Sequence, residues 1–229
     1  MPAAEQTWAS PVNTSFLASS VGRKIVMAVT GLAFCGFVSV HMVGNLQAYL
    51  GAEAMNAYAK FLHSFLHGGG IWVTRAALLV AVLLHAWAAL SLTLSNWTAR
   101  PQGYRAQQLQ AATWSSRTMR YTGVILACFI VYHLLHLTTG QAHPDFVAGD
   151  AYGNFVRGFQ QPLASACYIV AQLCLGLHLW HGVWSFTQTF GWSHPRYNLT
   201  RRAIATVLAV VVAGVNISFP ISVLLGVIR

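Results

Sequence analysis

The sequence predicts an all-α integral membrane protein with five transmembrane helices. Of its 229 residues, 56% are apolar and only 7% are charged, whereas an ordinary soluble domain carries about 25% charged residues. The mean hydropathy is +0.55. So few charges cannot cover a soluble globule of this size, and the apolar content excludes a disordered chain. The apolar runs are also long and unbroken, whereas a membrane β-barrel would show short alternating segments.

Five runs are long enough to cross a bilayer, which takes about 20 mostly apolar residues in a helix. They cover approximately residues 24–45, 71–95, 119–139, 163–187 and 203–227. We expect them to form one membrane domain that comprises residues 1–229. The first run is preceded by no short apolar segment with a cleavage site, so no removable signal peptide is expected. In the long first linker, Ala54–Leu66 has apolar residues at helical spacing, which predicts a short interfacial helix.

The basic residues predict the orientation of these helices. With a cytoplasmic N-terminus, nine lysines and arginines fall inside: Arg23, Lys24, Arg100, Arg105, Arg117, Arg120, Arg196, Arg201 and Arg202. Four fall outside: Lys60, Arg75, Arg157 and Arg229. The excess inside predicts an inside N-terminus and an outside C-terminus. Because these residues are distributed between the runs, they do not indicate a nucleic-acid-binding patch.

Histidine is the polar residue that recurs inside the runs, where polar side chains are costly. Six lie there: His41, His85, His133, His136, His178 and His181. The runs contain no aspartate or glutamate, and the four cysteines form no CxxC pair. Any single histidine could simply form a hydrogen bond with a neighbouring helix.

An internal repeat selects four of the six histidines. The first and third runs share five identities at an offset of 92, each paired in order: Met27 and Met119, Thr30 and Thr122, Gly31 and Gly123, Phe37 and Phe129, His41 and His133. The second and fourth runs share a Leu-His-x-Trp segment around His85 and His178, at an offset of 93. Repeats of this kind are common in membrane folds.

Depth in the membrane divides these four histidines into two layers. At about 1.5 Å per residue, His41 lies roughly 10 Å and His133 roughly 6 Å outward of the centre, whereas His85 and His178 lie about 2–4 Å inward of it. Two facing histidines can fill both axial positions of a haem iron, and an apolar bundle suits the macrocycle. The sequence therefore predicts that four of the helices form a bundle with two stacked haems. Because no axial position is left open, the expected role is electron transfer.

Further residues are candidates for contact with these groups. Gly31 and Gly123 are small enough to let a porphyrin or a neighbouring helix approach. His136 and His181 follow a proposed ligand by three residues, so each contacts a haem propionate or packs on the same face, and packing is the favoured interpretation. The cytoplasmic edge carries basic residues whose default role is topology and lipid contact, and some of which can pair with propionates of the inner haem: Arg23, Lys24, Arg117 and Arg120.

Several motifs carry a resemblance to a known family. Ser20–Gly31 reads SVGRKIVMAVTG and is followed by His41–Asn45, HMVGN. The third run contains Arg117–Gly123 and Tyr132–His136, and the fourth contains His178–Trp184, HLWHGVW. Together these segments resemble the cytochrome b subunit of succinate dehydrogenase or fumarate reductase, in the type where one fused five-helix chain binds two haems b. The resemblance covers nearly the whole chain.

This resemblance implies a ligand set and partners. The proximal haem iron would be held by His85 and His178, and the distal haem iron by His41 and His133, which is the pairing that the depth arithmetic gives. The partners would be a flavoprotein with FAD and an iron–sulfur protein, both docked on the cytoplasmic face of a bacterial inner membrane. Electrons would pass between the iron–sulfur centres and a quinone, usually menaquinone. This chain would be the electron-transfer subunit, with no catalytic residue for succinate.

The resemblance leaves four questions open. Some fumarate reductases of the family have a proton-transferring glutamate where this chain has Gly176, so the proton path is in doubt. The quinone site has two candidate positions, an outer one with His63, His67 and Arg75, and an inner one with Ser19, Ser20 and Arg23. The direction of catalysis and any higher oligomer are not given by the sequence.

Two other functions compete with this one. A di-haem b subunit of another quinone-linked dehydrogenase, such as a hydrogenase or formate dehydrogenase, would carry the same histidines. A haem-free anchor or a small transporter would not need them. A transporter is disfavoured, because the runs are unbroken at their centres except at Pro220 in the fifth.

Overall fold

The chain is all-helical in the part that the structure, a computed structural model, describes, which is residues 15–99 and 114–229. Five helices are long and apolar enough to cross a membrane, which confirms the predicted fold class. They are α1 (Ser20–Asn45), α3 (Gly69–Thr98), α4 (Trp114–His133), α6 (Pro162–Thr189) and α7 (Asn198–Leu224). A π-helical turn, η3 (Leu134–Thr138), continues α4 and was not predicted.

Local sequence explains where several of these helices begin. The Ser19 hydroxyl accepts a hydrogen bond from the Gly22 N–H and caps α1. Pro162 occupies the first turn of α6, where its missing N–H is not needed. Gly51 has a φ of 97°, a conformation that favours glycine, at the turn into the short helix α2 (Ala52–Ser64). α2 overlaps the predicted interfacial helix.

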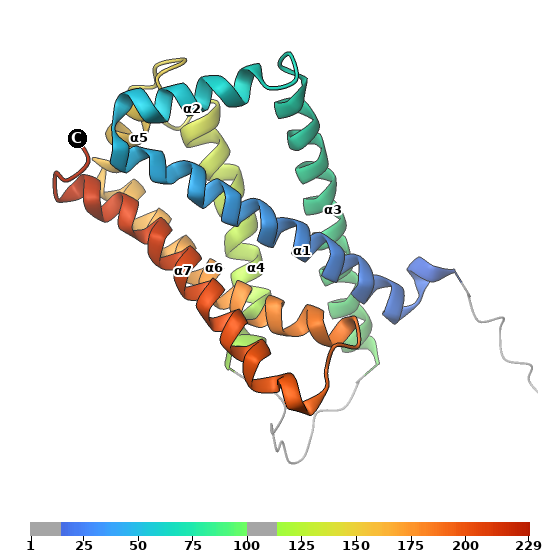
Figure 1. Ribbon diagram of the computed structural model, residues 1–229. Coiled ribbons are helices and arrows are strands. Elements are labelled where there is room, and N and C mark those ends of the chain that lie inside the picture. Colours follow the sequence, from blue (N-terminus) through green and yellow to red (C-terminus); the bar gives the residue numbers. More distant parts are fainter. Residues whose placement is uncertain (1–14, 100–113) are drawn as a thin grey trace, which may run out of the picture.

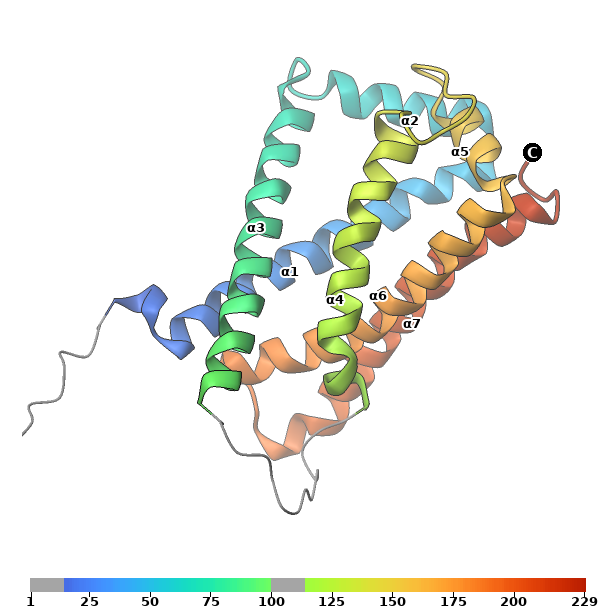
Figure 2. The same cartoon turned by 180° about the vertical axis from the view of Figure 1, so that it is seen from behind.

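The long helices pack as two pairs with a fifth helix on one side. α1 packs on α3, α4 packs on α6, α7 packs on α6, and α1 also contacts α6. α3 and α4 face each other across the bundle without being packed together (Figure 2). α2 lies across one end of the bundle, with the C-terminus nearby, and the turn between α6 and α7 lies at the opposite end (Figure 1). We call these the α2 end and the α6–α7 end.

A second short helix, α5 (Ala151–Phe159), lies at the α2 end and was not predicted. Its apolar side chains Phe155 and Phe159 are buried against Tyr168 of α6 and Phe219 of α7. These rings form the core of this end of the molecule. The spacing of its apolar residues is that of an amphipathic helix, but nine residues are too few to cross a membrane.

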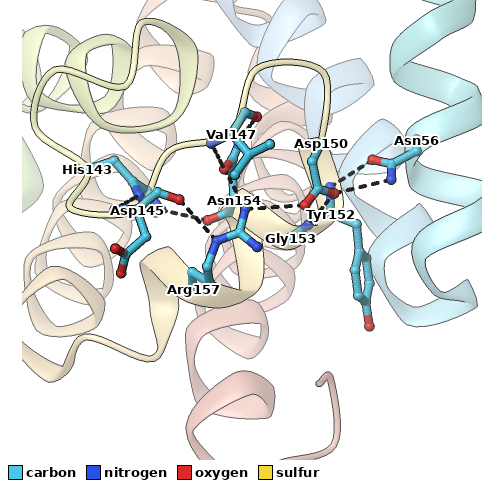
Figure 3. Close-up of polar contacts among 9 residues, drawn as sticks. All are labelled: Asn56, His143, Asp145, Val147, Asp150, Tyr152, Gly153, Asn154 and Arg157. Atoms are coloured by element: carbon cyan, nitrogen blue, oxygen red, sulfur yellow. Dashed lines mark hydrogen bonds and ion pairs between the residues drawn. The ribbon is translucent and has the colours of Figure 1, made fainter.

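A polar network, which we call the cap, attaches α5 to α2 and to the preceding loop (Figure 3). The Asn56 amide of α2 donates to Asp150 at 3.3 Å and accepts from the Tyr152 N–H at 2.9 Å. Asp150 also caps α5 by accepting from the Gly153 N–H at 2.9 Å. That backbone hydrogen bond, with smaller contributions from Asn56 and Arg157, holds the pKa of the Asp150 carboxyl below its usual value. The cap therefore fixes the loop over the α2 end.

Candidate functional site

Two of the four selected histidines meet in the middle of the bundle. His85 of α3 and His178 of α6 have ring centres 6.3 Å apart. Each Nδ1 lies beside a threonine of a different helix: His85 is 2.9 Å from the Thr30 hydroxyl of α1, and His178 is 3.2 Å from the Thr122 hydroxyl of α4. The inner pair predicted from the sequence is therefore brought together.

The other two histidines meet closer to the α2 end. His41 of α1 and His133 at the end of α4 have ring centres 5.9 Å apart. Each ring stacks on a phenylalanine one turn earlier in its own helix, Phe37 at 5.5 Å and Phe129 at 5.8 Å. The predicted outer pair is thus also brought together, and the two phenylalanines are partners in the sequence repeat.

The two pairs lie at different levels along the bundle. Thr30 marks the level of His85, and His41 follows it on α1 by 11 residues. Thr122 marks the level of His178, and His133 follows it on α4 by 11 residues as well. Eleven residues of α-helix span roughly 16 Å. The repeat in the sequence is therefore a repeat in space, with two histidine pairs one above the other.

The spacing within each pair fits a metal ion held between two imidazoles. With metal–nitrogen bonds of about 2.0 Å, two imidazoles on opposite sides of one ion have ring centres about 6.3 Å apart. The observed 6.3 and 5.9 Å are close to this value. Across residues 15–99 and 114–229, no group of three or more His, Cys, Asp or Glu could hold a metal ion. Two ligands from the protein suit a haem, because the macrocycle supplies the other four.

The glycine that follows the threonine in each repeat lies against a proposed ligand of a neighbouring helix. A Cβ on Gly31 would lie 3.4 Å from Cε1 of His85, and one on Gly123 would lie 3.6 Å from Cε1 of His178. The group that approaches each glycine in the structure is therefore the imidazole of a neighbouring helix.

The two additional histidines lie in different surroundings. His136, on η3, is only 1% exposed. Its Nδ1 lies 3.1 Å from the Tyr168 hydroxyl, which is also 3.1 Å from Nδ1 of His133. The His136 ring stacks on Tyr132 at 5.3 Å and on His143 at 4.9 Å. His181 is half-buried on α6. His136 is thus part of the packed α2 end, and the Tyr168 hydroxyl connects it to the proposed ligand His133.

The basic residues of the α6–α7 end differ in how they are engaged. Arg23 joins α1 to α3 by donating to the Ser95 hydroxyl at 2.9 Å and to the Ser91 carbonyl at 3.3 Å. Arg120 lies over the Trp97 ring at 5.7 Å and lines a cavity of about 590 Å³ between α3 and α4. Lys24 and Arg117 are exposed. Arg100 and Arg105 lie outside the described residues.

The outer quinone candidates are distributed over α2 (His63), the connection between α2 and α3 (His67) and the start of α3 (Arg75). Nδ1 of His63 is 2.8 Å from the Ala59 carbonyl, and His67 has a φ of 56°. The Arg75 guanidinium lies 5.0 Å from the centre of the Trp72 ring.

Two of the inner quinone candidates have structural partners at the start of α1. Ser19 caps the helix, and Arg23 is engaged with α3. Ser20 is exposed. At the position of the open proton path, a Cβ on Gly176 would lie 3.1 Å from Cβ of Ala213 on α7. A glutamate side chain at this position would therefore require α7 to move.

Sequence reasoning missed three hydroxyl groups and one histidine of the site. Thr30 and Thr122 were inside the repeated motif, but only their glycines were proposed as site residues. Tyr168 has no counterpart in the repeat, and position 75 at the equivalent offset is an arginine. His143 lies in a loop, where its Nε2 is 2.9 Å from the Asn154 carbonyl.

Comparison with known proteins identifies the family. The family model described as "Succinate dehydrogenase/Fumarate reductase transmembrane subunit" matches residues 98–217, just over half of the chain. The chain is 27% identical over 157 residues to the succinate dehydrogenase cytochrome b558 subunit of Bacillus subtilis (strain 168), which covers 68% of this chain and 72% of that protein. No solved structure gives a significant match. The chain therefore belongs to the succinate dehydrogenase/fumarate reductase transmembrane subunit family.

Proposed function

We propose that this chain binds two haems b and carries electrons between the iron–sulfur centres of a succinate dehydrogenase or fumarate reductase and membrane menaquinone. His85 and His178 hold the proximal haem iron, and His41 and His133 hold the distal one. The observation that carries this proposal is the pair of facing histidines at each of two levels, with ring centres 6.3 and 5.9 Å apart. A haem iron accepts and gives up one electron at a time.

The chain's own residues provide the ligands, the apolar surroundings and the spacing that two electron-carrying haems need. A haem held by two imidazoles at each level would supply one-electron transfer rather than oxygen chemistry. The apolar helices around the histidines exclude water from the bundle. The 11 residues between the levels on α1 and on α4 span roughly 16 Å along these helices, which makes a short path from one level to the other.

The charges at the α6–α7 end support the proposed orientation and partners. This end carries Arg23, Lys24, Arg117, Arg120, Arg196, Arg201 and Arg202. An excess of basic residues favours the cytoplasmic side of a bacterial inner membrane, so the N-terminus is inside and the C-terminus outside. The flavoprotein and the iron–sulfur subunit dock on this face. Arg120, beside the cavity of about 590 Å³, is suited to pair with a carboxylate of the proximal haem.

The test is a reduced-minus-oxidised visible spectrum of the purified membrane complex, with haem quantified per 24.9 kDa chain. We expect two low-spin b haems per chain, together with a co-purifying flavoprotein that oxidises succinate. A complex without haem would refute the proposal, and one haem per chain would restrict it to a single histidine pair. If a different dehydrogenase co-purified, the proposal of two haems would stand, but the proposed succinate-oxidising partner would have to be replaced.

A further inference from the structure

The Thr-Gly step of each repeat contacts a proposed ligand on the neighbouring helix in the same way. Thr30 of α1 contacts His85 of α3, and Thr122 of α4 contacts His178 of α6. Both threonines are buried, with exposed fractions of 7% and 4%. Two separate helix pairs therefore build the same contact.

Each threonine hydroxyl has backbone carbonyls of its own helix as acceptors for its hydrogen. Thr30 donates to the Val26 carbonyl at 2.7 Å, with the Met27 carbonyl at 3.2 Å as the other acceptor. Thr122 has the carbonyls of Thr118 and Met119, each at 3.1 Å. A hydroxyl has one hydrogen and two lone pairs. Each threonine oxygen is therefore left as an acceptor for the histidine.

With the threonine hydrogen donated to its own helix, the histidine is the donor. With the Thr30 oxygen as acceptor, Nδ1 of His85 carries the hydrogen, and the same argument applies to Nδ1 of His178. A neutral imidazole has one N–H, so Nε2 of each ring is left with its lone pair. A free Nε2 lone pair is what a metal ligand requires, and a hydrogen bond at the other nitrogen fixes ring orientation and tautomer.

The glycine after each threonine allows this geometry. Gly31 and Gly123 leave the Cε1 edge of the ring at van der Waals distance from the helix, as the 3.4 and 3.6 Å distances from their ideal Cβ positions show. A larger side chain would occupy the space of the ring. In each Thr-Gly pair, the threonine thus provides a hydrogen-bond acceptor for the histidine, and the glycine leaves room for the histidine ring.

We propose that Thr30 and Thr122 are positioning residues that hold His85 and His178 in the tautomer with Nε2 free to bind the proximal haem iron. This inference rests on the proposed function. A hydrogen bond from Nδ1–H to the hydroxyl increases the basicity of the ligand. Its loss therefore weakens donation to the ferric iron and shifts the midpoint potential of this haem to a more positive value. The distal haem, at the other level, is unaffected.

The experiment uses the purified complex with Thr30→Val and Thr122→Val, which remove the hydroxyl and keep the branched shape. Thr30→Ser and Thr122→Ser restore a hydroxyl. The matched control is Thr206→Val on α7, because the Thr206 hydroxyl donates to the Arg202 carbonyl at 2.9 Å on a helix without histidine. The readouts are a redox titration resolved for each haem and the electron paramagnetic resonance g-values of the ferric haems.

We expect both valine variants to shift the potential and g-values of the proximal haem alone, and both serine variants to resemble the parent protein. Loss of the proximal haem in the valine variants, with retention in the serine variants, would equally support a hydroxyl role. Unchanged values in both valine variants, or loss of the haem in the serine variants too, would overturn the inference. A parent complex without two bis-histidine haems would instead refute the proposed function.

Discussion

The two histidine levels are supported by different means, although the sequence repeat relates them. At the inner level, each ring is hydrogen-bonded to a threonine of a neighbouring helix. At the outer level, each ring stacks on a phenylalanine of its own helix. Only His133 has a hydrogen-bond partner there, the Tyr168 hydroxyl, and none is found for His41 within residues 15–99 and 114–229. The inner level is therefore symmetric and the outer level asymmetric, so the same change has different consequences at the two levels.

The largest expected effect comes from removing a ligand at either level. His85→Leu or His178→Leu should abolish the inner haem and keep the outer one, and His41→Leu or His133→Leu should do the reverse. One axial ligand of two is lost, so each variant should hold about half of the parent's haem per chain. Haem quantification and a redox titration measure which haem remains. Retention of both haems in any variant would remove that histidine from the ligand set, and His194→Leu, at an exposed position, is the control.

A smaller effect is expected from Tyr168→Phe, which tests the asymmetry of the outer level. The Tyr168 hydroxyl lies 3.1 Å from Nδ1 of both His133 and His136, and His136 is almost fully buried. Removing a shared partner leaves a buried group unsatisfied, which costs about 1–3 kcal/mol. We expect a lower thermal midpoint in detergent and a shifted potential for the outer haem only.

The phenylalanine substitution keeps the aromatic contacts of Tyr168 with Phe129 and Phe159. Tyr152→Phe is its matched control, because the Tyr152 hydroxyl donates to the Arg229 carbonyl at the protein surface. An unchanged outer haem in Tyr168→Phe would show that stacking alone supports this level. A shift of the inner haem would contradict the separation of the two levels.

Graded substitution of Gly31 tests the inner level by shape rather than by hydrogen bonding. A Cβ at this position would lie 3.4 Å from His85, so Gly31→Ala should retain both haems, whereas Gly31→Leu should displace the ring. Overpacking of this kind costs about 1–3 kcal/mol. Inner-haem content measured by spectrum should follow the size of the side chain. Gly36→Leu on the same helix is the control, because nothing lies within 4 Å of its ideal Cβ.

The sequence predicted the five long helices because each apolar run exceeds the length that a bilayer requires. The internal repeat also selected the histidines that meet in space, since an identical spacing on two helix pairs produces the same contact twice. The repeat contained Thr30 and Thr122, but which ring nitrogen faces a hydroxyl depends on packing between helices that are far apart in the sequence. For that reason only the glycines were proposed as site residues.

The α2 end was less predictable. Tyr168 is outside the repeat, and one of its two histidine partners, His136, lies in the π-helical turn Leu134–Thr138, for which the sequence gives no clear signal. Helix α5 has apolar residues at positions typical of an amphipathic helix, but its nine residues are far shorter than a membrane-spanning run. The cap that joins α5 to α2 is made by residues almost 100 positions apart, Asn56 and Asp150.

The smallest expected effect is at the cap. Asp150→Asn tests whether the cap supports the outer histidine pair or only covers that end of the bundle. The pKa of Asp150 is lowered by the Gly153 N–H first, and by Asn56 and Arg157. A lowered pKa in the folded state means that the ionised carboxyl stabilises the fold above the unfolded value of about 3.9. That contribution is lost as the pH falls through the lower folded value.

The size of this effect is limited by exposure and by the replacement itself. The Asp150 and Arg157 side chains are 35% and 33% exposed, so their ion pair contributes only about 0.2–1 kcal/mol. Asparagine is also a good helix cap. We expect Asp150→Asn to lower the thermal midpoint slightly at pH 7 and to leave both haem potentials unchanged, with Asp145→Asn in the same loop as the control. The difference in thermal midpoint should begin to decrease below about pH 3.9 and disappear as the pH falls through the lower folded pKa. If Asp150→Asn shifted the outer haem as much as Tyr168→Phe does, the cap would have to be counted among the supports of the outer histidine pair.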